Sequence, residues 1–221
     1  ASGGAPRGRD LLMAGQSRRF GALLLWAVPV LAALLCLGFG RYALSTGDTL
    51  RVLLSPLTGA EIAPMERSVV FGVRLPRVLT ALCCGAALAL SGAAFQSLFN
   101  NPLATPDTLG VSSGASCGAV AALMFRLDMV SVQLFALCFG LGAVALTWNI
   151  SKVRGKNSII MIVLSGLVIG ALFEAAVSLL KYVADPEEVL PTITYWLMGS
   201  LSAANYSTLL IGLPIIAAGA L

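Results

Sequence analysis

The residues best suited to chemistry in this sequence are serines set between glycines. Two overlapping segments, at 110–114 and 114–118, match the pattern G-x-S-x-G, which carries the nucleophilic serine of many hydrolases. Such a serine needs a base, usually histidine, and the sequence contains no histidine. A serine–lysine pair stays formally open, although Lys181 belongs to another apolar run and falls near its opposite end. We therefore predict that the chain is not an enzyme.

Other chemical motifs are incomplete. Gly155 and Lys156 resemble part of a phosphate-binding loop, but G-x-x-x-x-G-K-[ST] requires glycine at 150 and serine or threonine at 157, where the chain has Ile150 and Asn157. We expect no ATP binding by this device. The cysteines all lie in apolar runs without a C-x-x-C pair, which predicts buried apolar residues and neither a metal site nor a cofactor. They are Cys36, Cys83, Cys84, Cys117 and Cys138.

Composition predicts the surroundings of these residues. Hydrophobic residues make up 58% of the 221 residues and charged residues 11%, whereas about a quarter is charged in soluble domains. Such a chain has too few polar groups to cover a surface in water, so we expect a bilayer as solvent. The net charge of +4 is small and scattered, which argues against nucleic-acid binding.

Apolar runs predict an all-α, polytopic membrane bundle, because about 20 apolar residues in a helix cross a bilayer core. We expect one membrane domain over 1–221, with a polar external loop at 41–77 that holds a short capped helix, and a short helix or re-entrant turn at 191–202. The last run reaches residue 221 without a polar flank, which predicts a chain truncated at its C-terminus. The expected spans are 20–39, 78–99, 108–125, 129–150, 158–180 and 205–221.

Small residues recur every four positions in several of these runs. They include Gly110, Gly114 and Gly118 in the third run and Gly166 and Gly170 in the fifth, and a similar series at 85–93 lies in the second. Close approach of helix backbones through small residues is the usual cause in membranes. A wall of a transport path is the alternative, and the periodicity does not separate the two.

Glu174 is a carboxylate inside the fifth apolar run. Its insertion costs roughly 2.5–3.5 kcal/mol at a bilayer centre, and the surrounding apolar residues offset this. One interpretation is a carboxylate that reaches the interface or pairs with Lys181. The other is a polar position on a water-filled path, and a secondary transporter coupled to protons or ions through Glu174 is the corresponding alternative function.

Several motifs in register, between 74 and 202, resemble one family. They are Arg-Leu-Pro-Arg at 74–77, the small-residue series at 85–92, Gln96, Asn-Pro-Leu-Ala at 101–104, Leu-Gly-Val-Ser at 109–112 and Trp-Leu-Met-Gly-Ser at 196–200. This combination resembles the FecCD-type permeases of ABC importers, which carry iron–siderophore complexes, haem and vitamin B12. The resemblance implies a type II importer permease of about ten helices, of which about six are present here.

The resemblance also implies partners and a location. Such permeases work as pairs, as homodimers or with a homologous permease, on two cytoplasmic ATPase subunits, and they receive cargo from an extracytoplasmic binding protein. ATP hydrolysis on the partner then drives alternating access, with iron–siderophore the first expected cargo and haem or vitamin B12 also possible. The implied place is the plasma (inner) membrane of a bacterium or archaeon, with the N-terminus in the cytoplasm. Basic residues alone leave the orientation nearly balanced, although Arg18 and Arg19 favour the same direction.

Residue roles follow from the resemblance in the same way. Arg74 and Arg77 match arginines at the outer mouth that pair with glutamates of the binding protein, with interfacial anchoring as the alternative. The segment of Asn101, Pro102 and Leu103 matches an inner gate, with a plain turn before a helix capped by Asp107 as the alternative. The fifth run matches a path-lining helix, which makes Ser165, Glu174 and Ser178 candidates for the path. The family's ATPase-docking segment follows the sixth helix, beyond residue 221.

Overall fold

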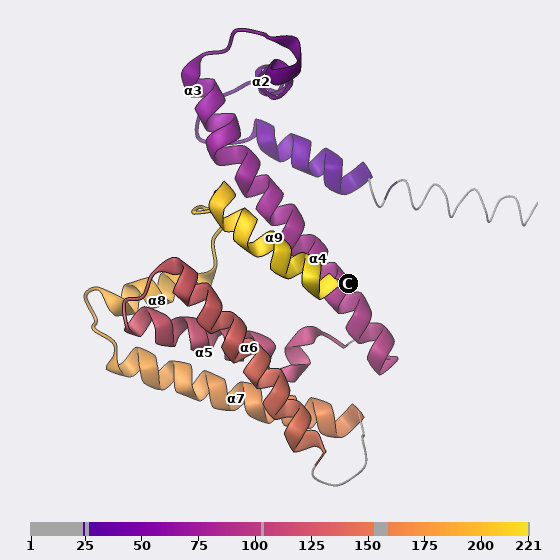
Figure 1. The fold of residues 1–221 in the computed structure, drawn as a ribbon, viewed down its shortest axis with the longest axis vertical. Helices are drawn as coiled ribbons and strands as arrows, with labels where there is room; N and C mark the ends of the chain where they lie inside the picture. Colours follow the sequence, from indigo (N-terminus) through magenta and orange to yellow (C-terminus); the bar gives the residue numbers. More distant parts are fainter. Residues whose placement is uncertain (1–23, 25–26, 103, 153–158, 221) are drawn as a thin grey trace, which may run out of the picture. The chain divides into compact units, whose positions relative to one another are not determined.

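A computed structural model describes residues 24, 27–102, 104–152 and 159–220, and every regular element in these ranges is helical (Figure 1). Contacts group the described residues into two compact units, one from those up to 86 with 201–219 and the other from those within 87–200. The elements are a helix over Ala27–Gly38, α2 (Thr46–Thr58), α3 (Pro64–Arg67), η1 (Ser68–Arg74), α4 (Leu75–Phe99), η2 (Pro106–Leu109), α5 (Val111–Met124), α6 (Met129–Ser151), α7 (Ile159–Val183), α8 (Val189–Met198) and α9 (Tyr206–Ala220).

Three helical stretches in the described ranges are long and apolar enough to cross a membrane. They are Pro64–Phe99, Met129–Ser151 and Ile159–Val183. They include the spans predicted at 78–99 and 129–150 and all of the span predicted at 158–180 except residue 158, which lies outside the described residues. The predicted span at 20–39 appears as Ala27–Gly38, and its first residues lie outside the described part of the chain. The short helix expected near 191–202 is α8, and α9 matches the last predicted run.

The loop predicted at 41–77 is wrong in its second half, because the helix of the second span already begins at Pro64. Proline at the first helical position fits there, since its fixed φ suits a helix start and its missing N–H is not needed. The chain then runs through the π-helical turns of η1 into α4. Charged residues in α3 gave this stretch the composition of a loop. The capped helix expected in the first half is α2, where the Ser45 hydroxyl accepts from the Asp48 backbone N–H at 3.1 Å.

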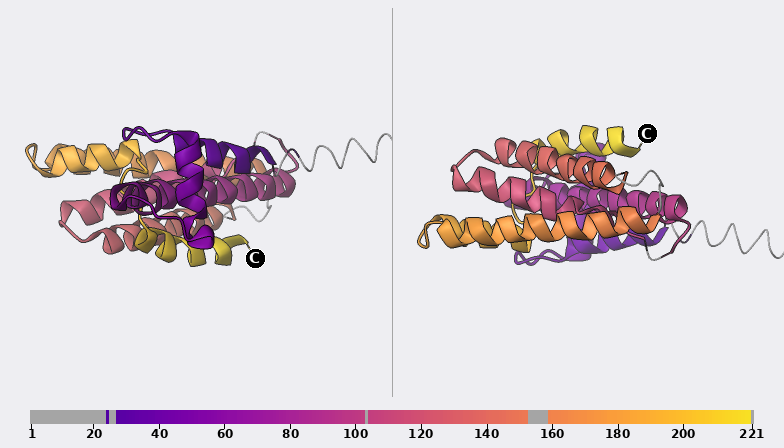
Figure 2. Two further views of the ribbon diagram at one scale, coloured as in Figure 1. Left: turned by 90° about the horizontal axis from the view of Figure 1, so that it is seen from above. Right: turned by 90° about the horizontal axis from the view of Figure 1, so that it is seen from below.

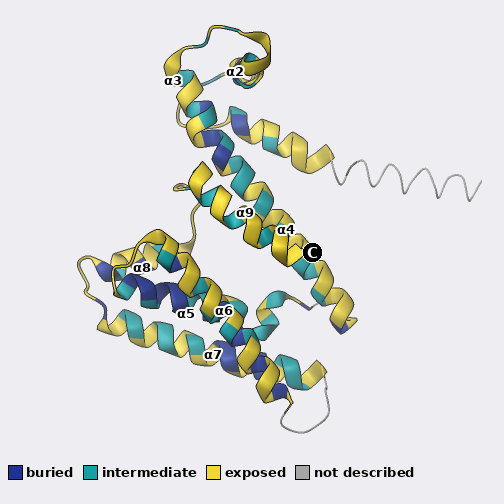
Figure 3. Cartoon of the chain, in the orientation of Figure 1, coloured by how far each residue is buried: buried dark blue, intermediate teal, exposed yellow. Residues whose placement is uncertain are grey.

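The core of the second unit is centred on α5, the most buried helix in Figure 3. Its apolar face packs with the beginning of α6 and with α8, so that Ala119, Val120, Val132 and Ile193 are fully buried. The predicted start at 108 is displaced to Val111, because Pro106–Leu109 forms a 3-10 turn that ends at Gly110 with φ +74°. Only glycine adopts that conformation without strain.

Close helix packing explains the glycines of α5 and α7. A Cβ on Gly114 would lie 2.8 Å from the Phe139 carbonyl oxygen, and one on Gly166 would overlap the Thr108 carbonyl. These distances confirm the packing interpretation for this part of the chain. The series at 85–92 differs, because a Cβ on Gly85 or Gly92 would meet no atom of the described chain within 4 Å.

The turn between α5 and α6 and the turn between α7 and α8 are held by carboxylates. Hydrogen bonds from the Ser131 hydroxyl and from backbone N–H groups hold the pKa of Asp128 below its usual value. Bonds from the N–H groups of Glu188 and Glu187 do the same for the pKa of Asp185. Both groups therefore stabilise the fold near neutral pH, and this contribution is lost as the pH falls through their lowered pKa values.

Candidate functional site

A polar pair joins α5 to α7 in the second unit. The Ser113 hydroxyl donates to Glu174 Oε1 at 3.1 Å, while the Glu174 side chain stays exposed in the described chain. The pairing with Lys181 considered from the sequence is absent from the described residues, where the recorded ion pair joins Arg126 and Glu188. Glu174 is thus a carboxylate on an apolar helix with one hydroxyl donor and without a cationic neighbour in the described chain.

The glycines of the same two helices position this pair. Gly110 lies against the backbone of Gly166 and Gly170, where an added Cβ would be 3.1–3.3 Å from backbone atoms. Ser113 lies about one helical turn after Gly110, and Glu174 lies about one helical turn after Gly170. The two side chains therefore face each other. The close backbone approach brings the hydroxyl within hydrogen-bonding distance of the carboxylate.

The other path candidates occupy different environments. Ser178 is exposed one turn beyond Glu174, and its hydroxyl donates to the Glu174 backbone carbonyl at 3.0 Å. Ser165 is buried, with 5% of its surface exposed, so it does not lie on an exposed face of the second unit. The structure thus places Glu174 and Ser178 together on the surface of α7 and separates Ser165 from them.

The described part of the predicted gate segment, Asn101 and Pro102, directly follows the end of α4. Asn100 adopts a left-handed conformation with φ 47°, the Asn100 N–H bonds to the Ser97 carbonyl, and the Asn101 N–H bonds to the Gln96 carbonyl at 3.1 Å. This is the Schellman arrangement, in which two backbone bonds close the last helical turn. Pro102 follows and is exposed, while Leu103 lies outside the described residues. The turn is stiff because its bonds are internal to the backbone and because proline fixes φ.

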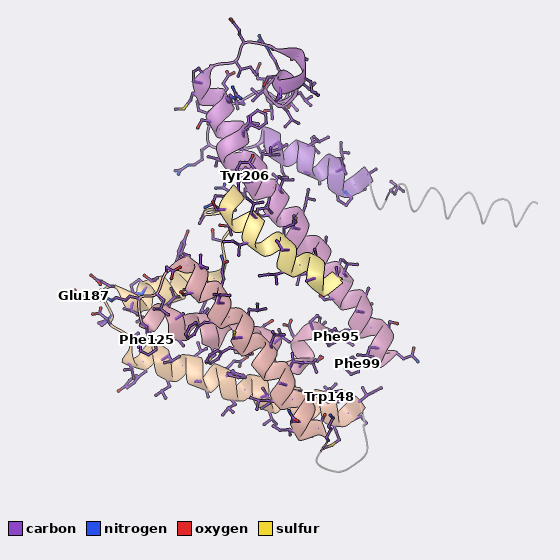
Figure 4. The ribbon with its side chains drawn as sticks, viewed as in Figure 1. Phe95, Phe99, Phe125, Trp148, Glu187 and Tyr206 are labelled. Carbon is purple, nitrogen blue, oxygen red and sulfur yellow. The ribbon has the colours of Figure 1, made fainter. Side chains whose placement is uncertain are left out.

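An apolar hollow of about 250 Å³ lies near this turn in the second unit. Its lining is almost entirely apolar and includes Phe99 from α4, Trp148 from α6 and Ile159 from α7. Figure 4 labels Phe95, Phe99 and Trp148, and the rings of Phe95 and Phe99 lie 5.7 Å apart. Lys152 lies 4.7 Å from the centre of the Trp148 ring. A hollow of this kind suits an apolar group better than a charged cargo.

Arg74, predicted to face a partner protein, is an interior residue of the first unit. Only 7% of its surface is exposed, and its guanidinium donates to the carbonyls of Leu37 at 2.7 Å, Gly38 at 3.3 Å and Tyr42 at 2.5 Å. These carbonyls belong to the end of the helix Ala27–Gly38 and to the segment that follows it. A Cβ on Gly40 would lie 2.7 Å from Arg74 Nη2, so glycine leaves room for the guanidinium.

Arg77 differs from Arg74 in that its side chain is exposed. It donates to the backbone carbonyls of Leu201 and Ser202, each at 3.1 Å. Nearby in the first unit, the Tyr206 hydroxyl donates to the Phe71 carbonyl at 2.7 Å. Arg77 therefore stands at the surface where the N-terminal part of α4 meets the segment before α9, which leaves one of the two predicted docking arginines accessible.

Sequence reasoning missed the partner of Glu174, because Ser113 is distant along the chain and stood out only as part of a false hydrolase motif. It also missed Thr147, which is fully buried on α6 and donates to the Leu109 carbonyl at 3.0 Å. A polar residue in an apolar run was the available signal for both.

Known proteins resemble this chain in fold and sequence. A solved ABC transporter, assigned to the metal-chelate type and captured in an inward-facing conformation, matches 86% of this chain with a TM-score of 0.71 and 41% sequence identity. The molybdate import permease MolB of Haemophilus influenzae is 43% identical over 82% of this chain. The hemin permease HmuU of Yersinia pestis is 39% identical over 65%, and the vitamin B12 permease BtuC of Escherichia coli O139:H28 is 32% identical over 83%.

The fold and these matches define a membrane permease of the ABC importer class. More narrowly, the chain belongs to the FecCD transport family, whose model matches residues 27–221. The chain spans about half the length of the curated relatives it matches, namely 54% of MolB, 44% of HmuU and 53% of BtuC. This membership confirms the resemblance inferred from the motifs, and it does not fit the alternative of a secondary transporter.

Proposed function

We propose that this chain forms part of the permease subunit of an ATP-driven importer for a metal-containing cargo. The observation that carries the proposal is the family match over residues 27–221. The subunit provides the path, and a partner ATPase supplies the energy that shifts it between two states of access. As the family resemblance implies, a second permease, two cytoplasmic ATPase subunits and an extracytoplasmic binding protein complete the assembly, in an inner membrane with the N-terminus in the cytoplasm.

For the cargo, we place molybdate first and iron–siderophore second. The molybdate permease MolB is 43% identical over 82% of the chain, a higher identity than the 39% over 65% with the hemin permease. The iron–siderophore expectation keeps support from a 34% identical relative named as a probable iron chelatin permease, in Helicobacter pylori. Haem and vitamin B12 are the remaining candidates, in line with HmuU and BtuC.

The experiment that tests this function uses the complete gene product. It is tagged, extracted in mild detergent and checked for a stoichiometric ATPase, and the complex is then reconstituted with its binding protein. ATP-dependent uptake of labelled molybdate, ferric siderophore, haem and cobalamin is compared in parallel. A permease that purifies without an ATPase in several detergents contradicts the importer proposal, whereas uptake of a different cargo contradicts only the order given above.

Within this function, the exposed face of α7 that carries Glu174 and Ser178 is assigned to the path. A carboxylate without a cationic neighbour costs less beside water than beside lipid. The gate role of Asn101 and Pro102 rests on the stiff turn at the end of α4. The docking role of the arginines rests on Arg77 alone, since Arg74 is engaged inside the first unit.

Glu174→Gln is expected to speed the uptake of an anionic cargo several-fold. The amide keeps an acceptor for the Ser113 hydroxyl but removes the charge, and repulsion of an anion at a few ångströms in a wet path is worth about 1 kcal/mol. Initial uptake rates of molybdate measure the effect. Ser178→Ala is the matched control on the same face, because its hydroxyl is bonded to the backbone and carries no charge. Equal rates for Glu174→Gln and the unaltered protein would remove Glu174 from the path.

A further inference from the structure

Helix α2 presents an apolar stripe to the exterior of the first unit. Leu50, Leu54 and Leu57 are 46%, 47% and 85% exposed. A helix turns by about 100° per residue, so these three side chains fall within an arc of about 60°. Three exposed leucines in register on one short helix form a surface that prefers an apolar partner.

The same helix has two further faces. Thr49 and Val52 are buried, with 4% and 1% exposed, on the side by which α2 packs against η1. Asp48 and Arg51 are exposed on a third side. The three faces point in directions about 120° apart: one is buried against the protein, one is exposed and apolar, and one is exposed and charged. This division is typical of helices that lie in a membrane interface.

The direction of α2 within its unit agrees with such a position. Figure 1 looks along α2 while α3 and the first part of α4 run across the picture, and the left view of Figure 2 shows α2 lengthwise. The helical stretch Pro64–Phe99 is long and apolar enough to cross a membrane. A helix that crosses the direction of a span, at the end of that span, runs along the membrane surface.

The segment before α2 holds the helix at the end of the span that begins at Pro64. Arg74, at the end of η1, holds the carbonyls of Leu37 and Tyr42, and α2 begins four residues later at Thr46. Phe39 is 80% exposed and Tyr42 is 42% exposed in this segment. Tyrosine and tryptophan are enriched where a membrane helix meets the headgroups, so the exposed Tyr42 fits this level, and the exposed Phe39 adds apolar surface beside it.

We propose that α2 is an interfacial helix whose leucine stripe inserts into the bilayer, on the side where the helix Ala27–Gly38 ends. The partner is the lipid itself. The stripe is apolar, and the single charges of Asp48 and Arg51 offset each other, so insertion does not depend on anionic lipids. The proposal concerns the chain's place in the membrane and holds whatever cargo the transporter carries.

Spin labelling of the complete gene product tests this assignment. In a variant without native cysteines, in nanodiscs of phosphatidylcholine with or without phosphatidylglycerol, Leu54→Cys carries the label, and Arg51→Cys is the matched control on the polar face. We expect the label at 54 to collide with oxygen and to be shielded from a water-soluble nickel complex, with a several-fold difference from position 51 in both lipid mixtures. If Leu54→Cys does not fold, Leu57→Cys replaces it, because that side chain is 85% exposed.

Two results would overturn the assignment. Equal access of the nickel complex to positions 54 and 51 would place the stripe in water. Shielding of position 54 from both oxygen and nickel would show that protein covers the stripe, as a soluble partner or another part of the permease would.

Discussion

Gly166→Ala is expected to destabilise the second unit by at least about 3 kcal/mol. An added Cβ would overlap the Thr108 carbonyl oxygen and would lie 2.9 Å from Leu109 Cα. These are backbone atoms, which do not rotate away as a side chain end does, so α7 must separate from the turn before α5. Overpacking of a core usually lowers the free energy of unfolding by about 1–3 kcal/mol. A clash with backbone atoms gives a loss at the upper end of this range, because the backbone cannot move aside. Thermal unfolding in detergent, followed by size-exclusion chromatography, measures the loss.

The matched control is Gly142→Ala on α6, where an added Cβ meets nothing within 4 Å in the described chain. Both substitutions replace glycine by a better helix former, which by itself favours folding by up to about 1 kcal/mol. We therefore expect Gly142→Ala to be neutral or slightly stabilising. Similar stability for the two variants would show that α7 and the turn at Thr108 do not approach as closely as described.

The movement of α7 away from α5 in Gly166→Ala should also weaken the hydrogen bond between Ser113 and Glu174. Gly166, Gly170 and Glu174 lie on one face of α7, so moving α7 away from α5 lengthens the Ser113–Glu174 hydrogen bond of 3.1 Å. If the exposed part of this face, at Glu174 and Ser178, lines the path, uptake falls in the fraction of protein that still folds. Uptake normalised to folded protein separates this effect from the loss of stability.

Arg74→Ala is expected to cost about 2–4 kcal/mol of stability and to loosen the end of the helix Ala27–Gly38. The guanidinium supplies donors to three carbonyls, those of Leu37, Gly38 and Tyr42, and alanine leaves them without these bonds in a buried or partly buried place. Each hydrogen bond to a charged group is worth about 1.5–3 kcal/mol, and water that reaches the freed carbonyls in the variant replaces part of this energy. Arg74→Lys should rescue little, because an ammonium lacks the planar fork that reaches separate acceptors.

Arg77→Ala is the informative comparison for this prediction. Arg77 is exposed and its two carbonyl acceptors belong to exposed residues, so stability should change by less than about 1 kcal/mol. If Arg77 docks the binding protein, Arg77→Glu lowers that protein's affinity at least tenfold while unfolding is nearly unchanged. Weakened docking by both arginine variants, with equal stability, would contradict the structural role of Arg74.

Composition and periodicity determined the class of this molecule. The apolar runs predicted helices in a bilayer, and the spaced motifs from Arg74 to Ser200 predicted the FecCD family, which the match over 27–221 confirms. The glycines of the third and fifth runs, among them Gly110, Gly114 and Gly166, indicated either close packing of helices or the wall of a path, and the structure shows the close packing. These features can be predicted from the sequence because helical spans, short motifs and small-residue repeats are all local patterns along the chain.

The tertiary structure alone decided what each polar residue does. Arg74 and Arg77 are three residues apart in one motif, yet one is buried among carbonyls and the other is exposed. Ser113 and Glu174 are 61 positions apart and form a hydrogen bond. The physical reason is the same in both cases: burial and hydrogen-bond partners depend on which helices approach each other, and that approach is set by packing between segments distant in the chain.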